Sequence, residues 1–510
     1  MSIIEWTTRI IKGNATGTGW ITLPVELHIE TSLGKWYDIK FTTNKKETFI
    51  LTLKLLKQKN VWGFYIPKSL CTEHNLITQL VSLTLQPSEY FPTKISADKR
   101  IRLPKSVVEC LNIKENELYE VQLNIHDKIF HEVVLITKID RSSRTAADEL
   151  YFTIRIQDIP TNTKVKVKMN KKLEQLISDK NKSSEDKVYL PNLFPDGVIG
   201  KLNHEKMILF LGNHKPVVTP ILLDITDLIH YFGCYYADGT KSGYGWSISA
   251  STPEQAVYYI IKYKSIISQP NLNFQLTYTL RPSVKDDPPL IKKRLTNLWF
   301  EKAGVEISQD RVYILQSSIQ HASEEIHYLS HNPIGSLRII DNKGLTLELH
   351  VKLLRYVENF LIQTNNKNLL WQFICGVMEG DGSVGGGKKR CRIHITCKKS
   401  DKLVPKILTK LGIYQVYKEY VKGKNVLEIS FGLIPILENI LVIQKLLFKY
   451  YPKRRKTFIK RLLNLPSVLY ILREREKLSH FALIPLKENS LLNDAILISR
   501  LKELRMELTR

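Results

Sequence analysis

The sequence predicts an α+β protein, with a mostly-β N-terminal region followed by a mixed region that contains two related segments. A pattern of strand, proline, short helix and strand occurs three times between residues 19 and 123. Farther along, two apolar helical segments end in the same Asp-Gly pair, and a strictly alternating segment follows the second. Helical and period-two patterns in one chain indicate a mixed fold.

The N-terminal copies share a short strand, a Leu-Pro or Ile-Pro pair, a short helix and a second strand. Their prolines are Pro24, Pro67 and Pro104. Proline suits this place because it ends a strand and can occupy the first helical position, where no N–H is needed. A unit this small cannot bury its own apolar faces, so we expect each copy to pair with a neighbour.

The third copy, DKRIRLPKSVVECLNIKENELYEV, resembles the swapped-hairpin (AbrB-like) DNA-binding family, and the first two copies resemble it more loosely. The resemblance implies that two hairpins interlock into one small β-barrel that binds DNA. Three copies leave one without a partner, so pairing of tandem copies within the chain and dimerisation of the protein both stay open. A separate segment between residues 145 and 222, KVKVKMNKKLEQLI, is a candidate diverged hairpin that the sequence does not assign. The expected DNA contacts here are Lys99, Arg100, Arg102 and Lys105.

The charge of the chain indicates an anionic partner, with nucleic acid as the leading candidate. There are 75 Lys and Arg against 50 Asp and Glu, a net charge of +25; a generally basic surface is the alternative. No uncharged apolar run reaches the roughly 18 residues of a membrane span, so no membrane partner is expected. The six cysteines show no C-x-x-C spacing, which argues against structural zinc or a disulfide framework. We expect a cytoplasmic protein that associates with the nucleoid when bound to DNA.

The two apolar helical segments are HYFGCYYADG (His230–Gly239) and FICGVMEGDG (Phe373–Gly382). Each carries two small residues four positions apart, which lie on one helix face and let two helices approach closely. These residues are Gly233 and Ala237 in the first segment, and Gly376 and Gly380 in the second. We therefore expect the two helices to pack on each other through Gly233 and Gly376.

Such packing brings Asp238 and Asp381 together at two helix C-termini, where the carbonyls are unpaired and the macrodipole is negative. A divalent cation relieves the repulsion, and carboxylate, carbonyl and water oxygens suit Mg²⁺ or another such ion, for example Mn²⁺. Gly239 and Gly382 are expected to end the helices in left-handed geometry. The alternative is that each Asp-Gly pair is only a helix stop.

Both segments resemble the motifs of the LAGLIDADG homing endonucleases, in the single-chain, two-motif form, over about residues 223–465. The resemblance implies a pseudo-symmetric pair of αββαββα halves, with the motif helices between them, and DNA cleavage associated with intron mobility. The metal ligands that it implies are Asp238, Asp381 and the carbonyls of Ala237 and Gly380. The family often has an acid two positions before the catalytic one; Glu379 fits this pattern and Tyr236 does not.

Candidate DNA-contact strands follow each motif. After the second, one face of an alternating strand carries Arg390, Arg392, His394, Thr396 and Lys398, and the other carries Cys391, Ile393, Ile395 and Cys397. After the first, a weaker counterpart aligns Gln275, Thr277, Thr279 and Arg281. A basic, hydrogen-bonding strand face can read the major groove; the alternative is a solvated sheet face.

A basic segment, FKYYPKRRKTFIKR, follows in the second half. The resemblance implies a lysine near the cleaved phosphate in each half, and we expect Lys453 or Lys456 to assist catalysis, with Arg454 and Arg455 as alternatives. Lys343 and Lys352 are weaker candidates in the first half. The other interpretation of this segment is a phosphate-neutralising patch without a catalytic role.

These features divide the chain into five regions. They are tandem hairpin repeats (1–145), a connecting region with a linker (146–222), two motif-bearing halves (223–350 and 351–465) and a helical tail (466–510). We expect a metal-dependent, double-strand DNA endonuclease that is monomeric through its motif halves. The alternatives are a non-cleaving DNA-binding regulator and a maturase that acts on intron RNA.

Overall fold

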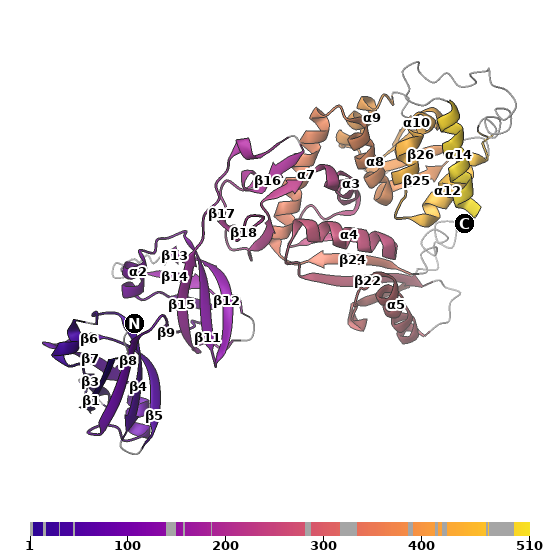
Figure 1. Cartoon of the computed structure of the whole chain (residues 1–510). Helices are drawn as coiled ribbons and strands as arrows, with labels where there is room; N and C mark the ends of the chain where they lie inside the picture. The colour runs from indigo at the N-terminus through magenta and orange to yellow at the C-terminus, as the bar shows by residue number, and fades with distance from the viewer. Residues whose placement is uncertain are drawn as a thin grey trace. The chain divides into compact units, whose positions relative to one another are not determined.

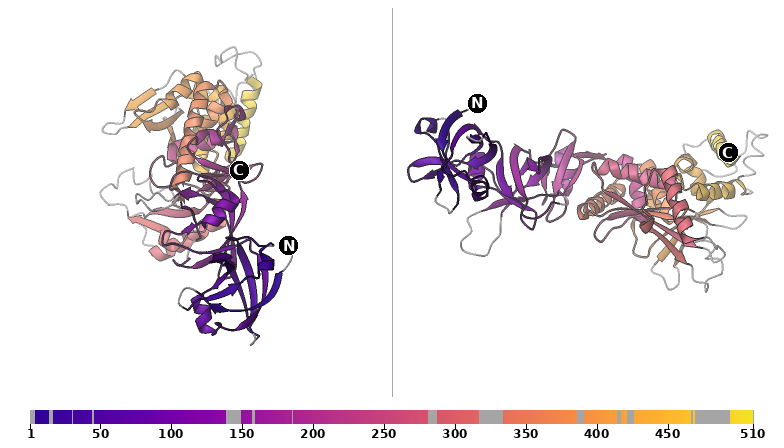
Figure 2. Two further views of the ribbon diagram at one scale, coloured as in Figure 1. Left: turned by 90° about the vertical axis from the view of Figure 1, so that its left-hand side faces the viewer. Right: turned by 90° about the horizontal axis from the view of Figure 1, so that it is seen from below.

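The computed structural model (Figure 1) is a mixed α+β protein that divides into two compact units, Met1–Leu176 with Gly200–Leu202, and Ile177–Ile199 with Asn203–Arg510. The residues that it describes are 4–13, 17–29, 31–43, 46–138, 149–156, 159–184, 186–280, 287–316, 334–385, 391–413, 417–420, 426–465, 468 and 494–509. In Figures 1 and 2 the first unit, drawn in indigo to purple, consists almost entirely of strands. Within the described ranges, no helix is long and apolar enough to cross a membrane.

The first two sequence copies share two four-stranded sheets, ordered β2-β3-β7-β6 and β1-β8-β4-β5. The strands before the short helices, β3 and β7, pair with each other, and so do the strands after them, β4 and β8. The elements are β1 (Ile4–Arg9), β2 (Ile11–Lys12), β3 (Gly19–Thr22), η1 (Val25–His28), β4 (Trp36–Thr43), β5 (Thr48–Lys54), β6 (Leu56–Gln58), β7 (Val61–Ile66), α1 (Lys68–Glu73) and β8 (Leu80–Pro87). Neighbouring copies thus bury each other's apolar faces, as their small size requires.

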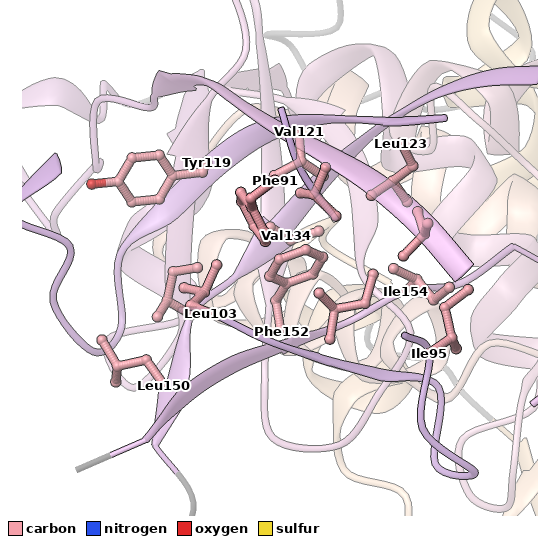
Figure 3. Close-up of a cluster of buried hydrophobic side chains, with 14 of the residues drawn as sticks. Phe91, Ile95, Leu103, Tyr119, Val121, Leu123, Val134, Leu150, Phe152 and Ile154 are labelled. Carbon is pink, nitrogen blue, oxygen red and sulfur yellow. The ribbon is translucent and has the colours of Figure 1, made fainter. Parts of the chain in front are cut away.

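The third copy pairs with a later hairpin of the same unit. The strand β10 pairs with β14, and β11 pairs with β15, around a core that includes Val121, Val134 and Phe152 (Figure 3). The elements are β9 (Phe91–Lys94), β10 (Arg100–Arg102), α2 (Lys105–Leu111), β11 (Leu118–Ile125), β12 (Lys128–Leu135), β13 (Thr137–Lys138), β14 (Leu150–Thr153) and β15 (Lys164–Lys172). Because these strands complete the sheets, the unit extends past the expected boundary at residue 145.

The three prolines lie one position earlier than expected. Pro24, Pro67 and Pro104 are the N-caps of η1, α1 and α2, with φ of −54°, −57° and −60° and extended ψ. Proline's fixed φ suits both positions, but the extended ψ makes each proline the last residue of the incoming chain rather than the first of the helix.

The second unit begins with short strands and 3₁₀ turns and continues into the first motif half. The leading elements are η2 (Lys180–Lys182), β16 (Lys187–Tyr189), η3 (Leu190–Leu193), β18 (Lys206–Phe210), β19 (Val217–Pro220), β20 (Leu222–Asp224) and η4 (Thr226–Leu228), while β17 (Val198–Lys201) spans the unit boundary. The first half contains α3 (Ile229–Asp238), β21 (Trp246–Ala250), α4 (Pro253–Ile266), β22 (Leu272–Leu280), α5 (Pro288–Ala303), η5 (Gln309–Arg311), β23 (Val312–Gln316), β24 (Ser336–Asp341) and α7 (Gly344–Gln363).

The second half follows the order α8, β25, β26, α9, β27, β28, α10, with a sheet ordered β25-β26-β28-β27. Its elements are α8 (Lys367–Asp381), β25 (Gly382–Gly385), β26 (Arg392–Lys398), α9 (Leu403–Lys410), β27 (Tyr417–Tyr420), β28 (Val426–Phe431), α10 (Leu433–Glu438), α11 (Ile440–Leu446) and α12 (Pro452–Leu463), with α14 (Asp494–Thr509) in the tail. The element order in this half is the αββαββα order that the family resemblance implies.

The first half departs from that order. Its first strand is reduced to an isolated bridge between Gly239 and Ile248, at the place where β25 pairs Gly382 with Ile395. In addition, α5, η5 and β23 lie between β22 and β24, so the sheet is ordered β21-β24-β22-β23. The departure is an insertion, because β21, β24 and β22 keep the antiparallel pairing seen in β26, β28 and β27.

Candidate active site

The two motif helices α3 and α8 pack directly against each other through their glycines. A Cβ added to Gly233 would lie 2.3 Å from the carbonyl oxygen of Phe373, and one added to Gly376 would lie 2.1 Å from that of His230. Real Cβ atoms essentially never come within 3.0 Å of such atoms. The structure therefore brings Gly233 and Gly376 to one backbone contact, which only residues without a side chain permit.

Each motif helix is apolar on all sides and lies in the interior of its unit. Every residue from Ile229 to Tyr235 is buried, and so is almost every residue from Leu369 to Glu379. Apolar side chains all round a helix require burial on every side. The side chain of Asn366 caps the start of α8 by accepting from the amides of Asn368 and Leu369.

Both motif acids are the last residues of their helices. Burial, and then the charge of Asp381, raise the pKa of Asp238 to about 6. Burial likewise raises the pKa of Asp381. A Cβ on Gly380 would lie 2.4 Å from Oδ2 of Asp238, so the carboxylate of the first helix lies against the backbone of the second. The two acids thus share one partly desolvated site.

Two cations lie beside the acids, and each caps a helix C-terminus. The Nη1 atom of Arg454 donates to the carbonyls of Glu379 (3.2 Å) and Gly380 (3.0 Å). The ammonium of Lys241 donates to the carbonyl of Tyr236 at 2.5 Å. Both cations act to lower the pKa of Asp238 and of Asp381. They thus offset the negative charge of the acids and of the helix ends.

One of these cations, Arg454, is among the four candidates of the basic segment, whereas Lys241 is not. Lys456 is exposed on α12, and the side chain of Lys453 lies outside the described residues. Arg454, from the same basic segment, is the residue that reaches the site, because its position on α12 directs it to the end of α8. Lys241 was missed, since nothing in the sequence marks a residue three positions after a motif acid.

The two weaker candidates in the first half are engaged elsewhere. The ammonium of Lys343 donates to the carbonyl of Gln269 at 3.2 Å. The ammonium of Lys352 donates to the carbonyl of Leu193 at 2.8 Å. Both lysines therefore bind backbone carbonyls of neighbouring segments.

The glycines after the acids do not adopt the expected left-handed geometry. Gly239 has φ −81° and ψ 148°, and Gly382 has φ −90° and ψ 147°, both extended. Glycine is required here for space instead: a Cβ on Gly239 would lie 2.1 Å from the ring of Tyr235, and one on Gly382 would lie 2.5 Å from the carbonyl of Met378. The chain turns directly from each helix into sheet pairing.

The donor set at the acids fits a divalent cation with oxygen ligands. Burial, and then the negative charge of Asp381, raise the pKa of Asp238, so a cation beside the two carboxylates would offset both effects. The carbonyl of Gly380 already accepts from Arg454, so Ala237 offers the less occupied backbone oxygen. Among the described residues, no group of three or more His, Cys, Asp or Glu side chains is placed to hold a metal. A cation here would complete its shell with water, as Mg²⁺ and Mn²⁺ do.

The strand β26 has the alternating faces that its sequence predicts. Cys391, Ile393, Ile395 and Cys397 are buried. The other face carries Arg392, His394, Thr396 and Lys398, whereas Arg390 lies outside the described residues. The sequence did not predict an acid on this face: Glu428 of β28 lies opposite Thr396 and pairs with Nδ1 of His394. The face is therefore mixed in charge.

The strand β22 presents Gln275, Thr277 and Thr279 opposite the buried Leu276, and Arg281 lies outside the described residues. The neighbouring strand β24 adds a guanidinium that the sequence did not single out, since Arg338 lies opposite Gln275. Nε and Nη2 of Arg338 donate to Oγ of Ser247, each at 3.1 Å.

The four basic residues predicted in the first unit all have partners. Lys99 donates to the carbonyl of Ile156 at 3.1 Å, and Arg100 pairs with Asp98 at 3.7 Å. Arg102 pairs with Glu149 at 3.3 Å, and Lys105 with Glu109 at 3.7 Å. Arg100, Arg102 and Lys105 remain largely exposed, so these surface ion pairs contribute little to stability.

Comparison with known proteins gives a limited result. No protein-family model matches the chain, and no curated protein matches it. Among solved structures, I-SmaMI bound to uncleaved DNA target in the presence of calcium ions is 13% identical, at a TM-score of 0.23, over 55% of this chain and 98% of that chain. A lysine-to-alanine mutant of I-SmaMI is 12% identical at a TM-score of 0.22, over 55% of this chain and 97% of that chain. Similarity at this level establishes neither a shared fold nor a shared activity.

Proposed function

We propose that this protein is a sequence-specific, metal-dependent DNA endonuclease of the LAGLIDADG homing type. The observation that carries the proposal is the meeting of Asp238 and Asp381 at the ends of two helices held together by Gly233 and Gly376. Burying two acids side by side is costly, and a bound cation repays that cost. A simple helix stop requires neither the shared site nor the glycine contact.

Each residue of the site has a distinct role in this proposal. A divalent ion, when bound, polarises a phosphate oxygen, activates water and stabilises the leaving oxygen. Asp238 and Asp381 hold it with the carbonyls of Ala237 and Gly380. Lys241 and Arg454 stabilise the charge that develops on the phosphate. One phosphodiester is hydrolysed on each strand, with both acids serving both positions.

The polar side chains of the strands and the charge of the chain indicate which surfaces hold the DNA. The open faces of β22, β24 and β26 carry amide, hydroxyl and guanidinium groups suited to base edges. The net charge of +25 supplies phosphate contacts. The first unit would add a second DNA-binding surface, as in the AbrB-like family. Its contact residues would be Lys99, Arg100, Arg102 and Lys105.

Cleavage of a randomised duplex library tests the proposal. The wild type, incubated with Mg²⁺ or Mn²⁺ and then with EDTA in its place, should cut a defined sequence only in the presence of the ion. Asp238→Asn and Asp381→Asn should each slow cleavage by at least about 10²-fold, as the loss of a charge-stabilising group does. Asp310→Asn is the matched control, because it removes an exposed carboxylate of η5, outside the motif helices.

The outcomes separate the alternatives. Selective binding of duplex DNA without cutting would mean a non-cleaving regulator. Binding of structured intron RNA in preference to duplex DNA would mean a maturase. Unimpaired cleavage by both Asn variants would place the active site elsewhere.

A further inference from the structure

The inserted strand β23 extends the sheet of the first half beyond the position where the second sheet ends. It runs parallel to β22, and its register aligns Leu276 with Val312, Thr277 with Tyr313 and Thr279 with Leu315. In the second half, the described sheet ends at β27, which occupies the place of β22. The extra strand is thus a feature of the first half among the described residues.

The register decides which way the side chains of β23 point. Aligned residues on neighbouring strands project to the same face of a sheet, and Leu276 and Val312 are both buried. Tyr313 and Leu315 therefore share the open face with Thr277 and Thr279. Both are well exposed, Tyr313 at 46% and Leu315 at 52%.

This open face is otherwise polar and basic. It carries Gln275 opposite Arg338, and Arg311, just before β23, donates from Nη1 to Oδ1 of Asn273 at 3.4 Å. Single exposed apolar residues are common on protein surfaces. Here, however, two apolar side chains on alternate positions continue a row of hydroxyl, amide and guanidinium groups, which is the mixture that a major groove requires.

We propose that β23 is part of the DNA-reading surface and that Leu315, with Tyr313 beside it, contacts thymine 5-methyl groups in the major groove. The proposal rests on the DNA-binding function proposed above, and it assigns the recognition of thymine to the inserted strand β23. The occupant is duplex DNA rather than an apolar protein surface, because the neighbouring Arg338 and Arg311 and the net charge of +25 match an anion. Thymine is the base that offers an apolar group in that groove.

Removal of the methyl group tests this assignment. A duplex selected by the full-length wild type from a randomised library is synthesised with deoxyuridine in place of thymidine, one position at a time, and binding is measured in EDTA. Loss of a contacted methyl should weaken binding about fourfold, equivalent to about 0.8 kcal/mol. The variant Leu315→Ser should bind the unmodified duplex more weakly and should no longer distinguish deoxyuridine from thymidine at that position.

The variant Leu290→Ser is the matched control. Leu290 is a leucine of the same insertion, 63% exposed, and it lies on α5 rather than on the sheet. It should retain the wild-type sensitivity to deoxyuridine. Indifference of the wild type to deoxyuridine at every position would overturn the inference even if Leu315→Ser failed to fold, as would undiminished sensitivity in Leu315→Ser. Failure to select any duplex would instead overturn the proposed DNA-binding function.

Discussion

The contact between Gly233 and Gly376 yields the sharpest prediction about the site. In Gly376→Ala the new Cβ would lie 2.1 Å from the carbonyl oxygen of His230, and also 3.0 Å from the amide nitrogen of Cys234. Both neighbours are backbone atoms of α3, so no side-chain rotation relieves the clash. The helices must separate, and the acids at their ends must separate with them.

The magnitude follows from that geometry. Since Cβ contacts below 3.0 Å are essentially never seen, the backbones must move apart by roughly 1 Å, and misplacement of this size costs about 10²-fold in rate. Overpacking costs about 1–3 kcal/mol, whereas alanine gains about 1 kcal/mol over glycine within a helix. Gly376→Ala should therefore lose about 2 kcal/mol of stability at most while losing most of its activity.

Single-turnover cleavage and thermal unfolding measure the two effects separately. The control is Gly432→Ala at the start of α10, where a Cβ would meet nothing within 4 Å. It should match the wild type in both assays. If Gly376→Ala cleaves within threefold of the wild type, the close approach of the two helices does not set the distance between the acids, and the reasoning fails.

Other predictions address the cations, the buried core and the first unit. Arg454→Gln and Lys241→Gln should each lower the cleavage rate while retaining duplex affinity within a few-fold, because each changes one charge beside the acids; equal rates would exclude the assigned role. Burial lowers the pKa of His350 to about 3, so below pH 6.5 the unfolded chain binds a proton that the folded chain does not. Stability should then fall by up to about 1.4 kcal/mol per pH unit from pH 6.5 towards 3, and thermal unfolding of His350→Gln should show a shallower pH dependence. Deletion of residues 1–176 should weaken DNA binding and reduce the slope of log affinity against log salt, because phosphate contacts are lost; an unchanged slope would exclude DNA contact by that unit.

The sequence predicts the candidate site only where the spacing of residues along a helix determines which residues touch. Small residues four apart place Gly233 and Gly376 on helix faces, and the acids follow from them. Lys241 and Arg454 lie beside the acids because of tertiary packing, and such packing produces no regular spacing of residues in the sequence. Glu428 likewise meets His394 only because β28 lies beside β26.

The same distinction holds for the fold. Three N-terminal copies could be predicted because each has the Leu-Pro or Ile-Pro signal between two strands. An Ile-Pro pair, Ile159-Pro160, also lies between β14 and β15, but residues 159–163 form no short helix after it. This fourth strand pair therefore lacks the full pattern, although its apolar residues complete the core around Phe152. The insertion of α5 and β23 could not be predicted, because its strand pairs in parallel with β22 across an intervening helix.

The structure also accounts for the departure at Tyr236. On α8 the equivalent residue, Glu379, is buried, its pKa is raised by burial to about 7, and its Oε1 accepts from the amide of Tyr450 at 3.1 Å. The carbonyl of Tyr450 in turn accepts from Thr252 at 2.7 Å, the N-cap of α4 in the other half. This position of the second motif therefore ties its helix to the start of a helix across the interface.

Tyr236 also links its helix to the other half, but it donates a hydrogen bond where Glu379 accepts one. Burial, and then a hydrogen bond to Asp401, raise the pKa of its phenol. The carboxylate of Asp401 also accepts from the amides of Leu403 and Val404 at the start of α9 in the second half. A phenol that donates to a carboxylate thus replaces a carboxyl group that accepts from an amide. Both versions link a motif helix to the other half, so the position serves the interface between the halves.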